Sequence, residues 1–263
     1  MTEQKVRLDV FLVRSGAARS RQVARELIAA GAVRVAGRVA VKPSQPVDDT
    51  TDIAVSRAPE GEFVSRGALK LLGALHDFSD IDVVGKRCID VGASTGGFTE
   101  VLLGAGAGQV VALDVGRDQL HPRLRADVRV HCIERTHVRD VTAKQIGGPG
   151  DIVVVDLSFI SLTHVMGRLA ELCAIDGVIV PMVKPQFEVG RARLGKGGVV
   201  RDRADHERSV RGVVAEAVRH GLSLHGIARS KVPGPAGNVE YFLRLQYAAD
   251  GHDFDELWPR VSG

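Results

Sequence analysis

The sequence predicts an α/β protein whose helices cover both faces of a mostly parallel sheet, preceded by a small basic α+β domain. Near-continuous Val and Ile runs at 109–116, 151–158 and 178–185 are separated by helical stretches, which is typical of parallel strands buried on both faces. Residues 5–45 hold nine Lys and Arg against two carboxylates, a local net charge of +7 in a chain whose net charge is +3. This separation of charge indicates two domains, of which the first binds a polyanion.

Composition places the chain among ordinary globular proteins. Its 263 residues suit one or two domains, and 44% of them are hydrophobic and 25% charged. No apolar run reaches the roughly 18 residues of a membrane helix, and residues 1–7 lack the apolar stretch of a signal peptide. The three cysteines and nine histidines show no metal-ligand spacing, and an odd number of thiols favours a reducing compartment. We therefore expect a cytoplasmic protein with no membrane span and no metal.

The basic segment is expected to form two short helices and a hairpin. Residues 7–13 carry apolar side chains at helical spacing, and a second helix over 21–30 follows Ser20, a residue type that caps helix N-termini. Valines alternate from 33 to 41 around Ala36-Gly37, which predicts a β-hairpin.

A turn-rich exit is expected over residues 42–60, which contain three prolines and several aspartates. We accordingly place the first domain at 1–60 with a linker to about residue 64, and the second domain at 65–263.

The basic segment also carries a specific pattern between Lys5 and Val55. It reads Arg-Leu-Asp-x-x-Leu-x-x-x-Gly, then Ser-Arg-x-x-Ala-x-x-Leu-Ile-x-x-Gly-x-Val-x-Val-x-Gly, then Val-Lys-Pro. This pattern resembles the S4-type RNA-binding domain, although a small basic domain could also bind an acidic protein. With no aromatic side chain besides Phe11, shape and backbone contacts with folded RNA are favoured over base stacking. The candidate RNA contacts are Arg7, Arg19, Arg21, Arg25, Arg34 and Lys42, with Arg66 beyond the segment.

Residues 87–98 predict a strand, a glycine-rich turn and the start of a helix that continues through Leu103. Glycines at such a turn let a ligand approach the backbone at the positive end of a helix. The spacing Asp-x-Gly-x-x-x-Gly-Gly differs from the dinucleotide pattern G-x-G-x-x-G, and resembles the S-adenosylmethionine loop of Rossmann-like methyltransferases. The candidate cofactor contacts in this loop are Asp90, Gly92, Ala93, Ser94, Thr95, Gly96, Gly97 and Phe98.

Polar residues also end the later strands. Asp114 follows the loop by about twenty residues, the place where an acidic residue accepts hydrogen bonds from ribose hydroxyls. Asp156 and Lys184 end two further strands. Taken one at a time, each could equally cap a helix or lie at the surface. Because the carboxyl ends of parallel strands meet at one edge, we expect these side chains to converge with the glycine loop.

Five motifs occur in order along the chain. They are Ser-Arg-Gly-Ala-x-Lys-Leu, Asp-x-Gly-Ala-Ser-Thr-Gly-Gly-Phe-Thr, Asp-Leu-Ser-Phe-Ile-Ser, Lys-Pro-Gln-Phe-Glu and Gly-Asn-x-Glu-Tyr-Phe. Together with the S4-type pattern they resemble the TlyA or hemolysin A family, FtsJ-like ribosomal RNA 2′-O-methyltransferases, over residues 5–247.

The resemblance implies a Rossmann-like class I methyltransferase domain with a seven-stranded sheet, which acts as a monomer. It implies S-adenosyl-L-methionine as cofactor, ribosomal RNA in ribosomal subunits as partner, and a cytidine 2′-hydroxyl of 16S or 23S rRNA as acceptor. It further implies an effect on capreomycin and viomycin susceptibility, and cofactor contacts by Asp156 and Phe159. The catalytic tetrad that it implies is Lys70, Asp156, Lys184 and Glu240.

These residue types suit the reaction. The sulfonium already makes the methyl group electrophilic, so the protein must align the hydroxyl and exclude water. Lys184 could accept the hydroxyl proton in its neutral form, or stabilise the developing alkoxide as an ammonium. Asp156 and Glu240 would hold the two lysines and the hydroxyl in line.

The chain departs from the family pattern at three positions. Phe63 replaces a Trp in the linker, Ala236 replaces a Ser in the Gly-Pro-Ser-Gly-Asn turn, and His137 stands where Asn is usual. The linker's role, a hydroxyl contact and the adenine-side contacts are therefore open.

Three other functions fit the sequence less well. A non-catalytic ribosome assembly factor would have no reason to keep the tetrad, and a membrane-active hemolysin would need an apolar segment that the sequence lacks. A base-amine methyltransferase would favour Asn/Asp-Pro-Pro-aromatic, whereas residues 156–159 read Asp-Leu-Ser-Phe.

Overall fold

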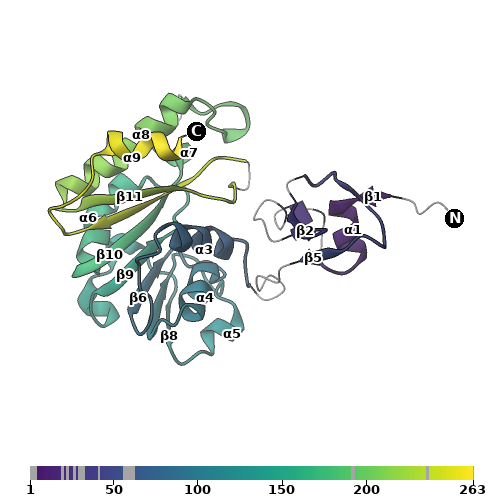
Figure 1. Cartoon of the computed structure of the whole chain (residues 1–263). Coiled ribbons are helices and arrows are strands. Elements are labelled where there is room, and N and C mark those ends of the chain that lie inside the picture. Colours follow the sequence, from purple (N-terminus) through teal and green to yellow (C-terminus); the bar gives the residue numbers. More distant parts are fainter. Residues whose placement is uncertain are drawn as a thin grey trace. The chain divides into compact units, whose positions relative to one another are not determined.

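The structure is a computed structural model that describes residues 5–18, 21, 24–25, 28, 33–40, 42–55, 63–190, 193–234 and 237–262. It divides into two compact units, residues 1–63 and 64–263 (Figure 1). Each unit has its own hydrophobic core.

The described part of the first unit contains a short helix, α1, further helical positions after Ser20, and two small antiparallel sheets. Its elements are β1 (Val6–Arg7), α1 (Leu8–Arg14), β2 (Val33–Val35), β3 (Arg38–Val39), β4 (Pro46–Val47) and β5 (Ile53–Val55). Strand β1 pairs with β4, and β2 lies between β3 and β5. Leu8, Leu12, Ile28 and Val33 are buried at the centre, because apolar side chains recur at helical spacing in α1 and alternate in β2.

The predicted hairpin is confirmed. Ala36 and Gly37, at its tip, have φ of 49° and 75°, as a two-residue turn between twisted strands requires. Of the predicted second helix, Arg21, Ala24, Arg25 and Ile28 are helical, and the other positions lie outside the described residues. The described part of the turn-rich exit, residues 42–55, also contains strands: Val47, Ile53 and Val55 pack against the core, and their strands pair with β1 and β2.

The second unit is built on a seven-stranded sheet, which confirms the predicted fold class. The strand order is β11-β12-β10-β9-β6-β7-β8, and β12 runs antiparallel to both neighbours while the other pairs are parallel. The strands are β6 (Arg87–Val91), β7 (Gln109–Leu113), β8 (Val130–Ile133), β9 (Gly150–Val155), β10 (Cys173–Val183), β11 (Ser223–Arg229) and β12 (Tyr241–Gln246).

Helices cover this sheet on both faces (Figure 1). They are α3 (Gly67–Asp77), α4 (Gly97–Gly104), α5 (Pro122–Arg125), α6 (Met166–Leu172), α7 (Pro185–Glu188), α8 (Arg203–Arg219) and α9 (Phe254–Val261), with the 3₁₀ turns η1 (Val138–Asp140), η2 (Ala143–Ile146), η3 (Leu162–His164) and η5 (Lys196–Gly198).

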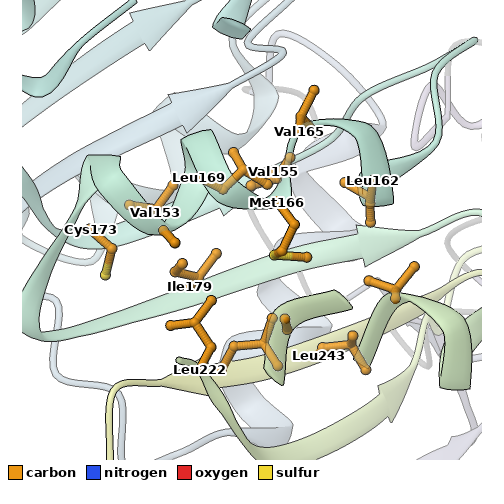
Figure 2. Close-up of a cluster of buried hydrophobic side chains, with 14 of the residues drawn as sticks. Val153, Val155, Leu162, Val165, Met166, Leu169, Cys173, Ile179, Leu222 and Leu243 are labelled. Atoms are coloured by element: carbon orange, nitrogen blue, oxygen red, sulfur yellow. The ribbon is translucent and has the colours of Figure 1, made fainter. Parts of the chain in front are cut away.

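The largest core cluster lies on the face that α6, α8 and α9 cover. Figure 2 shows Val153 and Ile179 of the central strands beside Met166 and Leu169 of α6. Side chains alternate between the faces of a strand, so Leu243 of β12 joins this cluster. The neighbouring Phe242 packs instead on Phe98 of α4, with ring centroids 6.1 Å apart.

The central strands end earlier than the sequence suggests, and this positions the site. Strand β10 ends at Val183, and Pro185 begins the short helix α7, whereas the apolar run that predicts this strand extends to residue 185. Proline lacks an N–H for the sheet but suits the first position of a helix. Asp114, Asp156 and Lys184 therefore follow β7, β9 and β10 directly and lie at the carboxyl edge of the sheet.

Candidate active site

Two adjoining cavities lie at the carboxyl edge of the sheet in the second unit. The first, of about 530 Å³, is lined from α3, the glycine loop, α7 and the segment before β12. The second, of about 650 Å³, extends over β7 and the turn before η1. The residues that line both cavities are Gly92, Ser94, Asp156, Ser158 and Phe159. The shared lining makes the two cavities parts of one cleft.

The glycine loop packs so closely that side chains would not fit. Gly92 has φ of 88°, and a Cβ there would overlap the carbonyl oxygen of Asp156. Gly96 has φ of 99°, and its Cβ would overlap Leu124. At Gly97 a Cβ would overlap the Ser65 hydroxyl and come within 2.9 Å of the backbone nitrogen of Ala68. These contacts hold the loop in one conformation, in which Gly92 and Gly97 line the first cavity and allow a ligand to approach the backbone.

Asp114 joins this loop to the next strand. Its Oδ2 accepts a hydrogen bond from the backbone N–H of Ser94 at 2.8 Å, and its Oδ1 accepts one from Gly116 at 2.6 Å. The half-buried carboxylate lines the second cavity. Each oxygen keeps a lone pair with which to accept a ligand hydroxyl.

Lys70 and Glu240 form a buried ion pair in the first cavity. Lys70 comes from α3, and its Nζ lies 2.5 Å from Glu240 Oε2. The second carboxylate oxygen, Oε1, is buried and has no hydrogen-bond partner among the described residues. Glu240 directly precedes β12, so the pair bridges residues 170 positions apart in the chain. A buried acceptor without a partner leaves this site able to take a donor from a ligand.

Lys184 and Asp156 form a second pair in the same cavity. Lys184 Nζ lies 2.6 Å from Asp156 Oδ1 and donates a hydrogen bond to Ser158 Oγ at 2.9 Å. The ammonium also lies 5.9 Å from the centre of the Phe187 ring. The four predicted catalytic side chains therefore line one cavity as two lysine–carboxylate pairs. Sequence reasoning missed the contact with Ser158, although the Asp-Leu-Ser-Phe motif contains this hydroxyl.

A second missed residue is Asn238, which is buried and lines the first cavity. Its side-chain oxygen accepts from the backbone N–H of Val200 at 3.0 Å, and its nitrogen donates to the Gly198 carbonyl at 3.0 Å. The amide thus holds Gly198 at the cavity wall. Its place in the Gly-Asn-x-Glu-Tyr-Phe motif was the available signal.

Glu188 connects the two loops that carry the Lys184–Asp156 pair. From the end of α7 its carboxylate accepts a hydrogen bond from the Ser161 hydroxyl at 2.5 Å and one from the Leu162 N–H at 2.9 Å. Burial raises the pKa of Glu188, and these hydrogen bonds partly oppose the shift. No local sequence signal marks this contact, because it depends on how α7 folds back.

Asp90 has a different position from the other predicted cofactor residues. It is fully buried, and its Oδ2 accepts a hydrogen bond from the Thr99 hydroxyl at 2.7 Å. Burial raises the pKa of this carboxyl to about 7, and the nearby Asp156 and Asp114 carboxylates raise it further against the Thr99 hydrogen bond. Asp90 and Gly96 do not line either cavity, so they lie beneath the cleft rather than in it.

The remaining loop positions face the first cavity, namely Gly92, Ala93, Ser94, Thr95, Gly97 and Phe98. Phe159 lies at both cavities, is 92% exposed, and has a φ of 66° that is rare for a bulky side chain. Its ring centre is 5.3 Å from that of Phe187.

The predicted RNA contacts have three kinds of surroundings. Arg34 and Lys42 are exposed in the first unit, and Arg7, Arg21 and Arg25 contact Asp9. In the second unit Arg66 begins α3 and lines the first cavity. Arg19 lies outside the described residues.

Of the family departures, His137 lines the second cavity and its Nδ1 accepts from the Arg139 N–H at 3.1 Å. Phe63 is half-buried, and Ala236 lies outside the described residues. Within the described part of the chain no helix is long and apolar enough to span a membrane, and no cluster of His, Cys, Asp and Glu suits a metal ion.

Comparison with known proteins finds a matching family for each of the two units. Residues 63–247 match the FtsJ-like methyltransferase family, and residues 6–53 match the S4 domain. The chain is 53% identical to the 16S/23S rRNA (cytidine-2′-O)-methyltransferase TlyA of Mycobacterium tuberculosis, over 94% of this chain and 92% of that protein. It is 39% identical to YqxC of Bacillus subtilis, a presumed rRNA methyltransferase, over 98% and 91%. A solved structure of a presumed hemolysin from Streptococcus thermophilus aligns with a TM-score of 0.73 and 35% identity, over 99% and 95%.

Proposed function

Because the chain belongs to the TlyA family of FtsJ-like methyltransferases, we propose that it transfers a methyl group from S-adenosyl-L-methionine to the 2′-hydroxyl of a cytidine in ribosomal RNA. The observation that carries this proposal is the presence of two lysine–carboxylate pairs, one buried and one partly buried, in one cavity beside the glycine loop. The 53% identical relative is named for this reaction on 16S and 23S rRNA.

The cleft suits the cofactor. The tight glycine loop leaves its backbone free for a close ligand, and the Asp114 carboxylate in the second cavity can accept ribose hydroxyls. When bound, S-adenosylmethionine supplies a methyl group that its sulfonium makes electrophilic. Ser94 and Phe159 line both cavities and would contact the cofactor along its length. Asp90 supports the loop from below, through Thr99 at the start of α4.

The paired lysines and carboxylates handle the acceptor hydroxyl. The hydroxyl loses its proton as its oxygen takes the methyl group, so a base or a cation at this oxygen lowers the barrier. Lys184, held by Asp156 and Ser158, can accept that proton as an amine or stabilise the oxygen as an ammonium. Glu240 Oε1, buried without a partner, can accept a ribose hydroxyl while Lys70 holds Oε2.

The first unit would hold the RNA. Its basic surface and its match to the S4 domain support contacts with the phosphates of folded rRNA through Arg7, Arg19, Arg21, Arg25, Arg34 and Lys42. We infer that the functional domains are residues 1–60 and 65–263, and that the protein works in the cytoplasm, where ribosomal subunits are found. A single chain supplies all four tetrad side chains, which supports an active monomer, and an effect on capreomycin or viomycin susceptibility would follow from the modified rRNA.

The reaction can be tested on isolated ribosomal subunits. A 2′-O-methyl group blocks alkaline cleavage at the next phosphodiester, so 30S and 50S subunits treated with the protein and S-adenosylmethionine should gain an alkali-resistant cytidine. Lys184→Ala is the control that should leave the rRNA unprotected.

Two outcomes would contradict the proposal. A mass increase of one methyl group without alkali resistance would indicate methylation of a base. No methylation at all, with rRNA binding intact, would favour the non-catalytic assembly factor.

A further inference from the structure

Asp9, in the first turn of α1, is a fully buried carboxylate of the first unit. Two guanidiniums lie close to it: Arg7 Nε is 2.9 Å from Asp9 Oδ1, and Arg21 Nη2 is 3.0 Å from Oδ2. A third, Arg25, places its Nε 3.4 Å from Oδ2. The three arginines come from β1 and from the helical positions after Ser20, so tertiary folding brings them to one acceptor.

Both oxygens of the Asp9 carboxylate accept hydrogen bonds from these arginines. Arg7 donates twice, through Nε to Oδ1 and through Nη2 to Oδ2 at 3.2 Å, so Asp9 accepts four hydrogen bonds from the described residues, three of them at Oδ2. A carboxylate offers about four lone-pair sites. Asp9 Oδ2 therefore has no capacity left for a further donor. The hydrogen bond from the Arg7 guanidinium is the main cause that holds the pKa of Asp9 well below its usual range. The carboxylate of Asp9 therefore stays negatively charged at neutral pH.

The arginines are not saturated. Their side chains remain 48%, 51% and 55% exposed for Arg7, Arg21 and Arg25. A guanidinium has five N–H donors, so each keeps donors that can reach a phosphate. Three cations on one anion leave a net charge of +2 at this surface.

A flexible arginine side chain loses rotamer entropy when it is fixed in one conformation. Here that ordering has taken place before any ligand arrives, because each guanidinium already rests on the same buried oxygen pair. Preorganisation of this kind raises affinity by lowering the ordering cost of binding.

We propose that Asp9 is a positioning residue for RNA binding, which fixes Arg7, Arg21 and Arg25 as one rigid surface for rRNA phosphates. This inference rests on the proposed function, in that it takes the first unit to bind rRNA. This role predicts an effect on RNA affinity opposite to the one expected from the charge of Asp9. Asp9 carries negative charge yet promotes binding of a polyanion.

The test compares two substitutions that change the charge of the full-length protein equally. Asp9→Asn and Asp49→Asn each remove one negative charge from the first unit. Asp49 is 75% exposed and pairs with Arg14 alone among the described residues. If charge alone matters, both variants bind rRNA more tightly. Positioning predicts that Asp9→Asn weakens binding to ribosomal subunits on the order of tenfold, with a log–log salt slope shallower by about one to two units, while Asp49→Asn binds as well as the wild type or better.

Folding is controlled in two ways. Circular dichroism and thermal unfolding establish whether Asp9→Asn is folded at the assay temperature. If it is not, Arg21→Lys replaces it, because this exposed position keeps its charge and loses only the fixed fork of donors. Positioning then predicts weaker binding by Arg21→Lys at unchanged net charge.

The outcomes separate this inference from the proposed function. Folded Asp9→Asn that binds as tightly as wild type, or Arg21→Lys with unaltered affinity, would overturn the positioning role. Wild-type protein that shows no salt-dependent affinity for ribosomal subunits would overturn the RNA-binding function itself.

Discussion

Two lysines with different sequence environments have the same kind of partner in this structure. Lys70 lies on an amphipathic helix and Lys184 follows a buried strand, and each meets a carboxylate within 2.6 Å. An ion pair taken out of water needs further hydrogen bonds to offset its desolvation. Ser158 supplies one to Lys184, whereas Glu240 Oε1 has none among the described residues. The unmet acceptor is the reason to place a substrate hydroxyl there.

The first prediction concerns these four side chains. Lys70→Ala, Asp156→Ala, Lys184→Ala and Glu240→Ala should each lose about a hundredfold or more of the methyl-transfer rate while retaining rRNA binding. Single-turnover methylation and filter binding measure the two effects. Lys231→Ala is the matched control, because its pairing with Asp77 at 2.6 Å is exposed and lies outside both cavities of the cleft.

Lys184→Arg separates the two roles of this lysine. A guanidinium cannot act as a base in the accessible pH range, so an inactive Arg variant with a pH-dependent wild-type rate supports proton transfer. An active Arg variant with a flat pH profile supports electrostatic stabilisation.

The second prediction concerns Asp90. Its folded pKa of about 7 exceeds the ordinary 3.8, so the native state binds a proton more tightly than the unfolded state. The stability that this gives is complete below the unfolded pKa and is lost as pH rises through about 7. Between the ordinary pKa of 3.8 and the folded pKa of about 7, the free energy of unfolding should therefore fall by up to about 1.4 kcal/mol per pH unit.

Urea unfolding at pH 5 and pH 8 tests the Asp90 prediction. The difference in the free energy of unfolding between the two pH values should be smaller for Asp90→Asn, because an asparagine cannot ionise. An identical difference in both proteins would show that Asp90 is not the group responsible.

Among the elements, the glycine loop and α4 act as one piece. Gly96 ends the loop with a left-handed conformation that allows α4 to begin at Gly97, under the side chains of Leu120 and Leu124. The loop and the start of this helix were predictable, because glycine spacing and apolar periodicity are local signals. The close packing around the loop was not, because the contacting residues come from other segments.

The third prediction compares two glycines of this region. Gly96→Val forces a β-branched residue into φ of 99° against Leu124, and should weaken S-adenosylmethionine binding at least tenfold and lower the melting temperature. Gly104→Ala, in α4 with open space around its Cβ, should bind normally and be more stable by about 0.5–1 kcal/mol.

Titration calorimetry and thermal unfolding give both readouts. Asp114→Ala adds a variant without backbone strain, and its binding should also weaken because a ribose acceptor is lost. Normal affinity in both Gly96→Val and Asp114→Ala would show that the cofactor site has been misplaced.

For the whole molecule, the two units have separate cores and separate chemistry. The lysine–carboxylate pairs and the glycine loop lie in residues 64–263, whereas the surplus of positive charge lies in residues 5–45. A cofactor site built wholly within one unit does not require the other for its geometry.

The fourth prediction is that removal of residues 1–60 leaves cofactor affinity unchanged and abolishes most methylation of ribosomal subunits. Calorimetry and methyl incorporation measure the two effects. Loss of rRNA affinity should come with a shallower salt dependence, by roughly 0.7 to 0.9 log–log units per phosphate contact removed. A truncated protein that methylates subunits at the full rate would assign the first unit another purpose.

Local patterns in the sequence were enough for the parallel strands β6, β7, β9 and β10, the glycine turn, the hairpin at Ala36-Gly37 and the basic character of the first unit, whereas β8 was missed. Each depends on residues within one turn or strand of one another. The end of β10 at Val183 could also have been read from Pro185.

Only the tertiary structure decided which side chains meet. The order of strands brings Glu240 to Lys70 and Asp156 to Lys184, and the first unit's fold brings three arginines to Asp9. Burial likewise separated Asp90, which lies beneath the cleft, from Asp114, which lines it. Charge pairing and burial are set by contacts between distant segments, and local periodicity carries no information about those contacts.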